Sequence, residues 1–154
     1  MKIEFTYSFG LPRKIVWTHI KEAAILKNAL TGCKEFEEIQ NGTYRAMVDI
    51  NFGPLQDIFE LEIVRTKEKS PSSYELMVKG KGKLGEIQGK GNLHFLESQG
   101  FTKMNLDAEA ELTGSLAIVG KKMLEGSARK GLERFFQLIE KEIKRSLFLQ
   151  KRGR

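Results

Sequence analysis

The stretch Leu116–Leu149 reads LAIVGKKMLEGSARKGLERFFQLIEKEIKRSLFL and decides the architecture of this chain. Its apolar residues recur at intervals of three and four, the spacing that places side chains on one face of a helix. They are Leu116, Val119, Met123, Leu124, Ala128, Leu132, Phe135, Phe136, Ile139, Ile143 and Leu147. The spacing predicts one long C-terminal helix over the whole stretch.

The apolar face of this predicted helix is uneven, with small residues in its first half and large ones in its second. A glycine inside a helix costs roughly 1 kcal/mol relative to alanine. Gly120, Gly126 and Gly131 therefore indicate that something approaches the first half closely. Two interpretations stay open: close packing on a curved sheet, or a cavity beneath the small half.

The composition indicates one globular domain. The 154 residues are 40% hydrophobic and 9% aromatic, enough for a core. A lone Cys33 excludes an intramolecular disulfide, and two His with one Cys are too few for an ordinary zinc site, so we predict no metal and no cofactor. We also expect a reducing, cytoplasmic setting, because neither a signal peptide nor a membrane span of about 20 apolar residues is found.

The net charge of +6 is concentrated at the C-terminal end. From Lys141 onward there are six basic side chains and one acidic one. A basic tail on a near-neutral body is a weak signal for nucleic acid, and we predict no nucleic-acid partner. We assign residues 1–148 to one domain and 149–154 to a basic tail. Together with Leu147, Phe148 and Leu149, the basic residues suit peripheral contact with an anionic membrane at its inner face, and a frayed, solvated terminus is the alternative.

Alternating polar and apolar residues predict strands through most of the remaining chain. Lys2–Tyr7 forms the first strand, and two short helical segments follow between Pro12 and Leu30. Six further strands lie between Phe36 and Leu112, with Asn41-Gly42 as a hairpin turn. The predicted fold is α+β: a helix-grip fold in which a seven-stranded antiparallel sheet wraps around the long C-terminal helix.

Residues that could carry chemistry are few. Gly80–Gly85 matches G-x-G-x-x-G, but a strand follows it where a dinucleotide site needs a helix. His19 and His94 lack a nucleophile or orienting acid nearby in sequence. Asp57 shares the inward parity of Phe59, and it is interpreted either as a polar ligand contact or as a solvated turn residue. We predict no catalytic residue.

Several short segments carry a family resemblance. They are Val16-Trp17, Leu30-Thr31-Gly32-Cys33, Phe52-Gly53-Pro54, Gly89-Lys90-Gly91, Gly100-Phe101-Thr102, Gly114-Ser115-Leu116-Ala117 with Gly120, and Phe135-Phe136. In this order they resemble the carbon-monoxide-dehydrogenase G-subunit family of the START/Bet v 1-like (SRPBCC) superfamily. The resemblance covers Lys2 to Ile143, with departures at Thr31, where the family commonly has Pro, and in the strand of Glu60 and Glu62, where a Gly is common.

The resemblance implies a hydrophobic cavity between the sheet and the long helix. It also implies a link, in some members, to molybdenum hydroxylases or to the membrane that receives their electrons. Our leading hypothesis is a non-enzymatic protein that binds or carries a lipid or a quinone-like molecule as an accessory to such an oxidoreductase complex. The alternatives are a cyclase or hydrolase of the same superfamily, and an assembly or interaction factor with a filled cavity.

The candidate ligand contacts combine inward-facing strand residues with the small half of the predicted helix. They are Trp17, Val48, Ile50, Phe52, Phe59, Leu61, Leu76, Val78, Gly89, Gly91, Ala108, Ala110, Gly120, Met123, Leu124 and Ser127.

Overall fold

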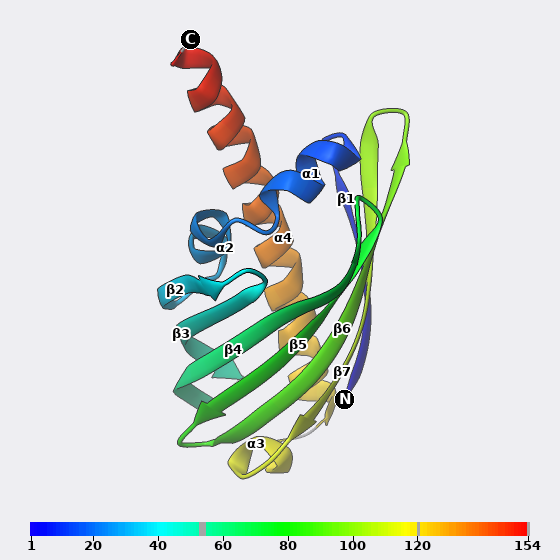
Figure 1. The fold of residues 1–154 in the computed structure, drawn as a ribbon. Coiled ribbons are helices and arrows are strands. Elements are labelled where there is room, and N and C mark those ends of the chain that lie inside the picture. Colours follow the sequence, from blue (N-terminus) through cyan, green and yellow to red (C-terminus); the bar gives the residue numbers. More distant parts are fainter. Residues whose placement is uncertain (53–54, 120, 154) are drawn as a thin grey trace.

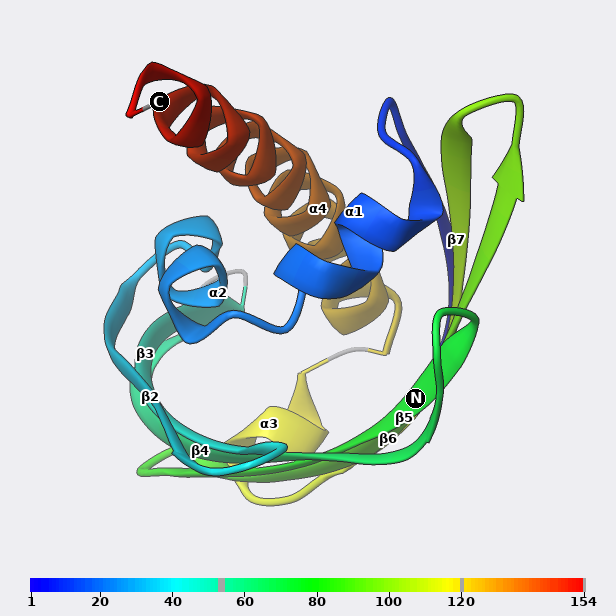
Figure 2. The ribbon, with the colours of Figure 1, turned by 45° about the horizontal axis from the view of Figure 1, so that its top comes forward.

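The computed structural model of the protein describes residues 1–52, 55–119 and 121–153. Seven antiparallel strands form a single sheet in the order β1-β7-β6-β5-β4-β3-β2 (Figure 1). The strands are β1 (Lys2–Phe9), β2 (Cys33–Gln40), β3 (Thr43–Phe52), β4 (Leu55–Lys69), β5 (Ser73–Gly82), β6 (Gly85–Ser98) and β7 (Phe101–Leu112). The sheet curves around a long C-terminal helix, which confirms the predicted α+β helix-grip fold (Figure 2).

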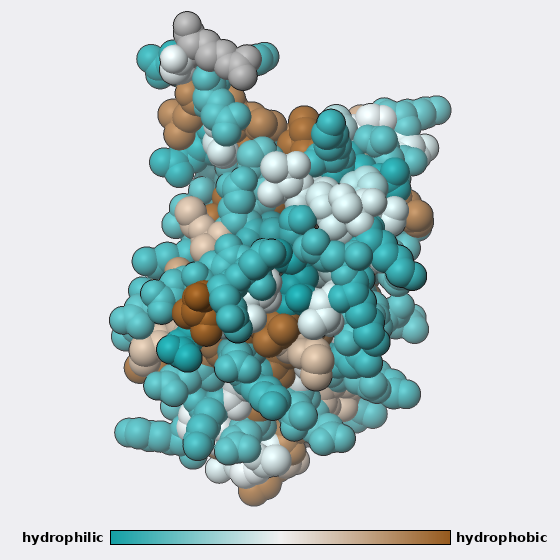
Figure 3. All heavy atoms as spheres, viewed as in Figure 1, coloured by the Kyte–Doolittle hydropathy of each residue, from teal (hydrophilic) through white to brown (hydrophobic). Residues whose placement is uncertain are grey.

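The alternation of the strands separates an apolar inner face from a charged outer face. Phe59, Phe95 and Met104 are fully buried on the inner side. Opposite charges are paired across the strands on the outer side, where Glu60 lies opposite Lys81 and Glu62 opposite Lys79. Such pairs stabilise a sheet modestly and keep its solvent face polar, and the side of the sheet seen in Figure 3 is largely hydrophilic.

Two short helices follow β1, as the sequence predicted. They are α1 (Arg13–His19) and α2 (Ala23–Ala29). Trp17 of α1 is buried against the rings of Tyr74 and Phe95, with centroid distances of 5.5 and 5.8 Å. Helix α2 lies beside the C-terminal helix, where Asn28 Nδ2 donates to Glu142 Oε2 at 3.3 Å. The pair therefore spans from the sheet to the C-terminal helix.

The prediction of one continuous helix from Leu116 is wrong at its start. A four-residue helix, α3 (Ser115–Ile118), ends where Val119 takes an extended conformation with φ −67° and ψ 135°. The long helix, α4 (Lys121–Arg152), begins after this break. Periodicity alone could not detect the break, because Leu116, Val119 and Met123 keep a helical spacing although Val119 itself is extended.

Helix α4 buries one face and extends beyond the sheet. Leu124, Phe136, Ile139 and Ile143 are buried along it. Its 32 residues span about 48 Å at 1.5 Å per residue, and its C-terminal end projects past the body of the protein (Figure 1). The predicted tail at 149–154 thus begins inside this helix.

Candidate functional site

The inner face of the sheet, α2 and the middle of α4 enclose a cavity of about 240 Å³. Strands β4 and β5 contribute Leu61, Leu76 and Val78 to its wall. Helix α4 contributes Phe135, Phe136 and Ile139, and the α2 region contributes Leu26 and Leu30. Apart from Lys21, Tyr44, Arg65 and Tyr74, the described side chains that line the cavity are apolar.

A polar cluster forms one part of this wall. The Arg65 side chain is only 9% exposed, and its guanidinium donates from Nε to the Glu68 carboxylate and from Nη1 to the Tyr44 hydroxyl. The Tyr44 hydroxyl donates in turn to the backbone carbonyl of Lys21 at 2.6 Å. The Lys21 ammonium lies 3.6 Å from Glu68 and 4.3 Å from the centre of the Trp17 ring. A buried arginine is thus held by a carboxylate and a phenol at the edge of an apolar space.

Burial sets the protonation states in this cluster. It raises the pKa of the Tyr44 hydroxyl, although the adjacent Arg65 charge acts in the opposite direction. Burial lowers the pKa of Arg65, but Tyr44 and Glu68 outweigh that effect and the net pKa is raised. Burial also raises the pKa of Tyr74. At physiological pH the cluster therefore contains a charged guanidinium and neutral phenols.

Three of the sixteen predicted contacts line this cavity: Leu61, Leu76 and Val78. Val48, Phe59 and Leu124 are buried in the packed interior, and Trp17 of α1 packs against the ring of Tyr74. Ile50 and Ser127 are half-buried, and Met123 is 49% exposed on the first turn of α4. Gly89 and Gly91 of β6 lie opposite Ala110 and Ala108 of β7. The side chain of Phe52 and the whole of Gly120 lie outside the described residues.

The interpretation that the small half of α4 is closely approached is wrong for Gly126 and Gly131. Both are exposed, and a Cβ added at either would meet nothing within 4 Å. The cavity lies against the bulky half instead, where Phe135 and Phe136 belong to its wall. The glycines are therefore on the solvent side of the helix.

The sequence analysis missed the polar cluster, although a signal for it was present. Leu61, Ile63 and Arg65 share the inward parity of strand β4, so a charged side chain follows two apolar ones on the buried face. A charge at an inward position is rare unless it is paired or functional. Tyr44, interpreted from the sequence only as a strand residue, lies on the neighbouring strand β3, and its hydroxyl accepts the hydrogen bond from Arg65.

Three of the polar residues considered from sequence have hydrogen-bond partners in the structure. His19 Nδ1 lies 2.8 Å from Glu22 Oε1. Asp57 Oδ2 accepts from the backbone N–H of Leu84 at 2.7 Å and thereby holds the turn between β5 and β6. Burial raises the pKa of the Cys33 thiol, and its Sγ donates to the carbonyl of Glu35. None of these side chains belongs to the cavity wall.

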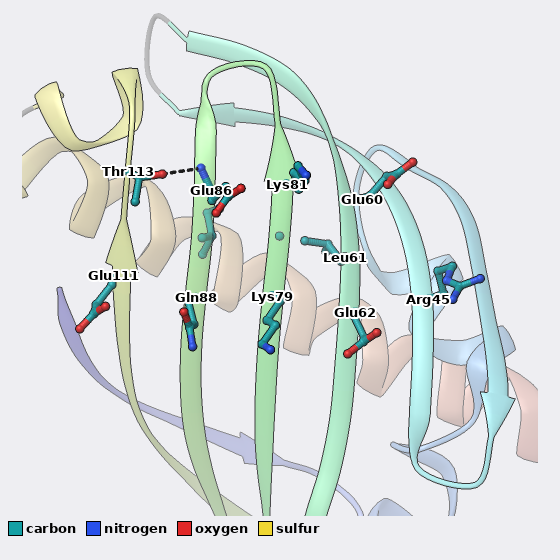
Figure 4. Close-up of a pocket in the computed structure, with 12 residues that line it drawn as sticks. Arg45, Glu60, Leu61, Glu62, Lys79, Lys81, Glu86, Gln88, Glu111 and Thr113 are labelled. Carbon is teal, nitrogen blue, oxygen red and sulfur yellow. Dashed lines mark hydrogen bonds between the residues drawn. The ribbon is translucent and has the colours of Figure 1, made fainter.

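A larger hollow, about 600 Å³, lies on the outer face of the sheet (Figure 4). Side chains of alternating charge surround it, among them Arg45, Glu62 and Lys79, and Thr113 Oγ1 accepts from the Glu86 N–H at 3.0 Å. Ligand sites are typically concave and largely apolar with a few convergent polar groups. The inner cavity meets that description and the charged outer hollow does not, so the inner cavity is the candidate site.

Within residues 1–52, 55–119 and 121–153, no helix combines the length and hydrophobicity that a membrane span requires. The same part of the chain contains no group of three or more His, Cys, Asp or Glu side chains placed to hold a metal ion.

A curved antiparallel sheet that grips a long C-terminal helix is the START-like helix-grip fold, and here an apolar cavity lies between the two. Residues 8–144 match the family model for the G subunit of carbon monoxide dehydrogenase (CoxG). The chain therefore belongs to the CoxG family, which confirms the resemblance seen in the sequence.

Solved structures share this fold. A conserved protein from Geobacillus kaustophilus has 27% identity and a TM-score of 0.89, with 95% of this chain and 97% of that chain covered. The Zhui aromatase/cyclase from a Streptomyces species has 10% identity and a TM-score of 0.70, with 96% and 95% covered. A START superfamily protein from Mycobacterium smegmatis has 10% identity and a TM-score of 0.69, with 94% and 97% covered. No protein with a curated description matches the sequence.

Proposed function

We propose that this protein is a non-enzymatic binding or carrier protein for a hydrophobic small molecule, such as a lipid or a quinone-like compound. The observation that carries the proposal is the apolar cavity of about 240 Å³ between the sheet and α4. Sites for drug-sized ligands typically measure about 300–1,000 Å³. The cavity is slightly smaller, so it suits a compact molecule or one end of a longer one.

The chemistry of the cavity wall favours binding over catalysis. A cyclase or hydrolase needs a general acid and a general base within reach of its substrate. Among the described residues that line the cavity there is no carboxylate and no imidazole. The charged guanidinium and the phenols of raised pKa are hydrogen-bond donors and poor bases at neutral pH. These groups suit recognition of a ligand.

Membership of the CoxG family supports a more specific role. We propose that the protein acts as an accessory to an oxidoreductase of the molybdenum-hydroxylase or carbon monoxide dehydrogenase type. In that role a bound quinone-like molecule would be exchanged between the cavity and the enzyme complex. An assembly factor is the competing role, and it would not depend on an occupied cavity.

The projecting end of α4 supports peripheral attachment to an anionic membrane. Phe148 and Leu149 are 59% and 54% exposed there. Hydrophobic and hydrophilic side chains are mixed at this end (Figure 3), and the nearby basic residues are Lys144, Arg145, Lys151 and Arg152. Basic and apolar side chains together suit a helix at the surface of a bilayer. Such attachment would place the cavity near lipid from which it could be loaded.

Binding of the neutral fluorophore N-phenyl-1-naphthylamine tests the proposed function. Val78 lines the cavity, whereas its neighbour Met77 is 41% exposed on the opposite face of β5. Val78→Trp should weaken probe binding about tenfold or more, because it fills the cavity. Met77→Trp, which adds the same indole outside, should bind like wild type. Leu76→Phe replaces Val78→Trp if that variant fails to fold.

Two results would overturn the proposal. One is a wild-type protein that does not bind the fluorophore. The other is equal probe affinity in wild type, Met77→Trp and the cavity-filling variants, which would place the bound probe elsewhere.

A further inference from the structure

The polar part of the cavity wall is rich in hydrogen-bond donors. The Tyr44 hydroxyl oxygen accepts from Arg65, and its proton is used in the bond to the Lys21 carbonyl. Arginine carries five N–H donors, and the cluster uses only those on Nε and Nη1 that reach Glu68 and Tyr44.

Tyr74 adds a hydroxyl that has no hydrogen-bond partner among the described residues. Its side chain lines the same cavity and its residue is 6% exposed, with the ring packed against Trp17 and Phe95 at 5.5 and 5.7 Å. Within the ranges the structure describes, no hydrogen bond to its hydroxyl is found, and no side-chain polar atom that is fully buried lacks a partner. The Tyr74 hydroxyl is therefore open to the cavity rather than sealed in the core.

An unpaired polar group in an apolar space is costly unless something satisfies it. Because burial raises its pKa, the Tyr74 hydroxyl keeps its proton and remains a donor throughout the physiological range. The Lys21 ammonium and the Arg65 guanidinium share the Glu68 carboxylate, so two cations lie on this side of the cavity. Both features call for an electron-rich oxygen on the ligand.

We propose that the cavity selects molecules with an apolar body and a carbonyl or carboxylate oxygen at one end, and that this oxygen accepts a hydrogen bond from Tyr74. This inference rests on the proposed function and specifies its ligand class. The apolar walls formed by Leu76, Val78 and Phe136 hold the body, and Tyr74 beside Arg65 holds the oxygen.

Three phenylalkyl compounds of similar size test the inference by displacing N-phenyl-1-naphthylamine. n-Pentylbenzene has no acceptor, valerophenone has a neutral carbonyl, and 5-phenylpentanoate has a carboxylate. Wild type should bind at least one of the two acceptor compounds about 3- to 10-fold more tightly than pentylbenzene, the effect of one added hydrogen bond. A preference for the carboxylate that weakens with salt shows that charge adds to the hydrogen bond from Tyr74, and a preference for the ketone assigns the selectivity to the hydroxyl alone.

Tyr74→Phe keeps the ring and removes only the donor, so it should abolish that preference and leave pentylbenzene affinity unchanged. Tyr7→Phe is the matched control, because the Tyr7 hydroxyl bonds to Glu140 at 3.2 Å and does not line the cavity. Equal wild-type affinity for the three compounds, or a preference that survives in Tyr74→Phe, would overturn the inference while leaving an apolar carrier. If wild type binds none of the three, the proposed function fails and this inference fails with it.

Discussion

Truncation of Phe136 to alanine tests how α4 is docked. The Phe136 ring is 3% exposed and lies 5.2 to 6.3 Å from the rings of Phe5, Tyr7, Phe9 and Phe135. Burying an apolar side chain of this size contributes about 1.5–3 kcal/mol. Lost ring contacts and the enlarged void raise the expected cost to about 3–5 kcal/mol. That is a large share of a typical total stability of about 5–15 kcal/mol.

The assay is urea and thermal unfolding followed by far-UV circular dichroism. For a chain of this size the expected loss corresponds to a fall in Tm of about 6–20 °C. Phe148→Ala is the control, since Phe148 lies on the same helix, is 59% exposed, and undergoes the same change in helix propensity. Phe135→Ala, at a half-buried position, should fall between the two. A Phe136→Ala protein that melts within a degree or two of Phe148→Ala would refute the docking of α4 through this ring.

The intact protein should co-sediment with anionic vesicles but not with neutral ones, its binding should weaken with salt, and deletion of residues 145–154 should abolish it. Binding that survives the deletion, or no binding by the intact protein at low salt, contradicts membrane attachment. Gly126→Ala should stabilise α4 by about 0.5–1 kcal/mol, because a Cβ there meets nothing within 4 Å; a lower Tm would show that the position is crowded. Burial, aided by Glu140, raises the pKa of Tyr7 from 10.0 to about 12, so the folded state holds this proton more tightly than the unfolded state does. The free energy of unfolding should therefore fall as the pH rises from about 10 to 12. Tyr7→Phe should reduce that fall, and an unchanged dependence of stability on pH argues against the raised pKa.

The fold was predictable because the two-residue alternation of its strands and the three-to-four-residue spacing of its long helix continue over many residues. Alternation along each strand assigns one face to the core, and a one-residue slip would reverse every side chain. Asn41-Gly42 also marks its hairpin reliably, since Gly42 has φ +83° and an added Cβ would lie 3.2 Å from the Arg65 carbonyl oxygen. These are local signals, and they transfer directly to the structure.

The position of the cavity was not predictable in the same way. It depends on how α2 and α4 are placed against the curved sheet (Figure 2), which is a tertiary property that the spacing of residues along one element does not contain. Small residues such as Gly126 and Gly131 suggested the wrong half, because a glycine on the solvent side of a helix has the same spacing as one on a packed side. Inward parity at Arg65 was the more informative signal, since a buried charge needs a reason.

The polar cluster has a structural role that is separable from ligand recognition. Through Arg65, Tyr44 and the Lys21 carbonyl it links strands β3 and β4 to the connection between α1 and α2, which borders the cavity. Removing Arg65 would leave Glu68 without its closest partner and release that connection, so a loss of binding in such a variant would not identify a ligand contact. Tyr74 takes no part in these bonds, although it lies beside them. Its hydroxyl is therefore the group whose removal changes what the cavity recognises without changing what holds the cavity together.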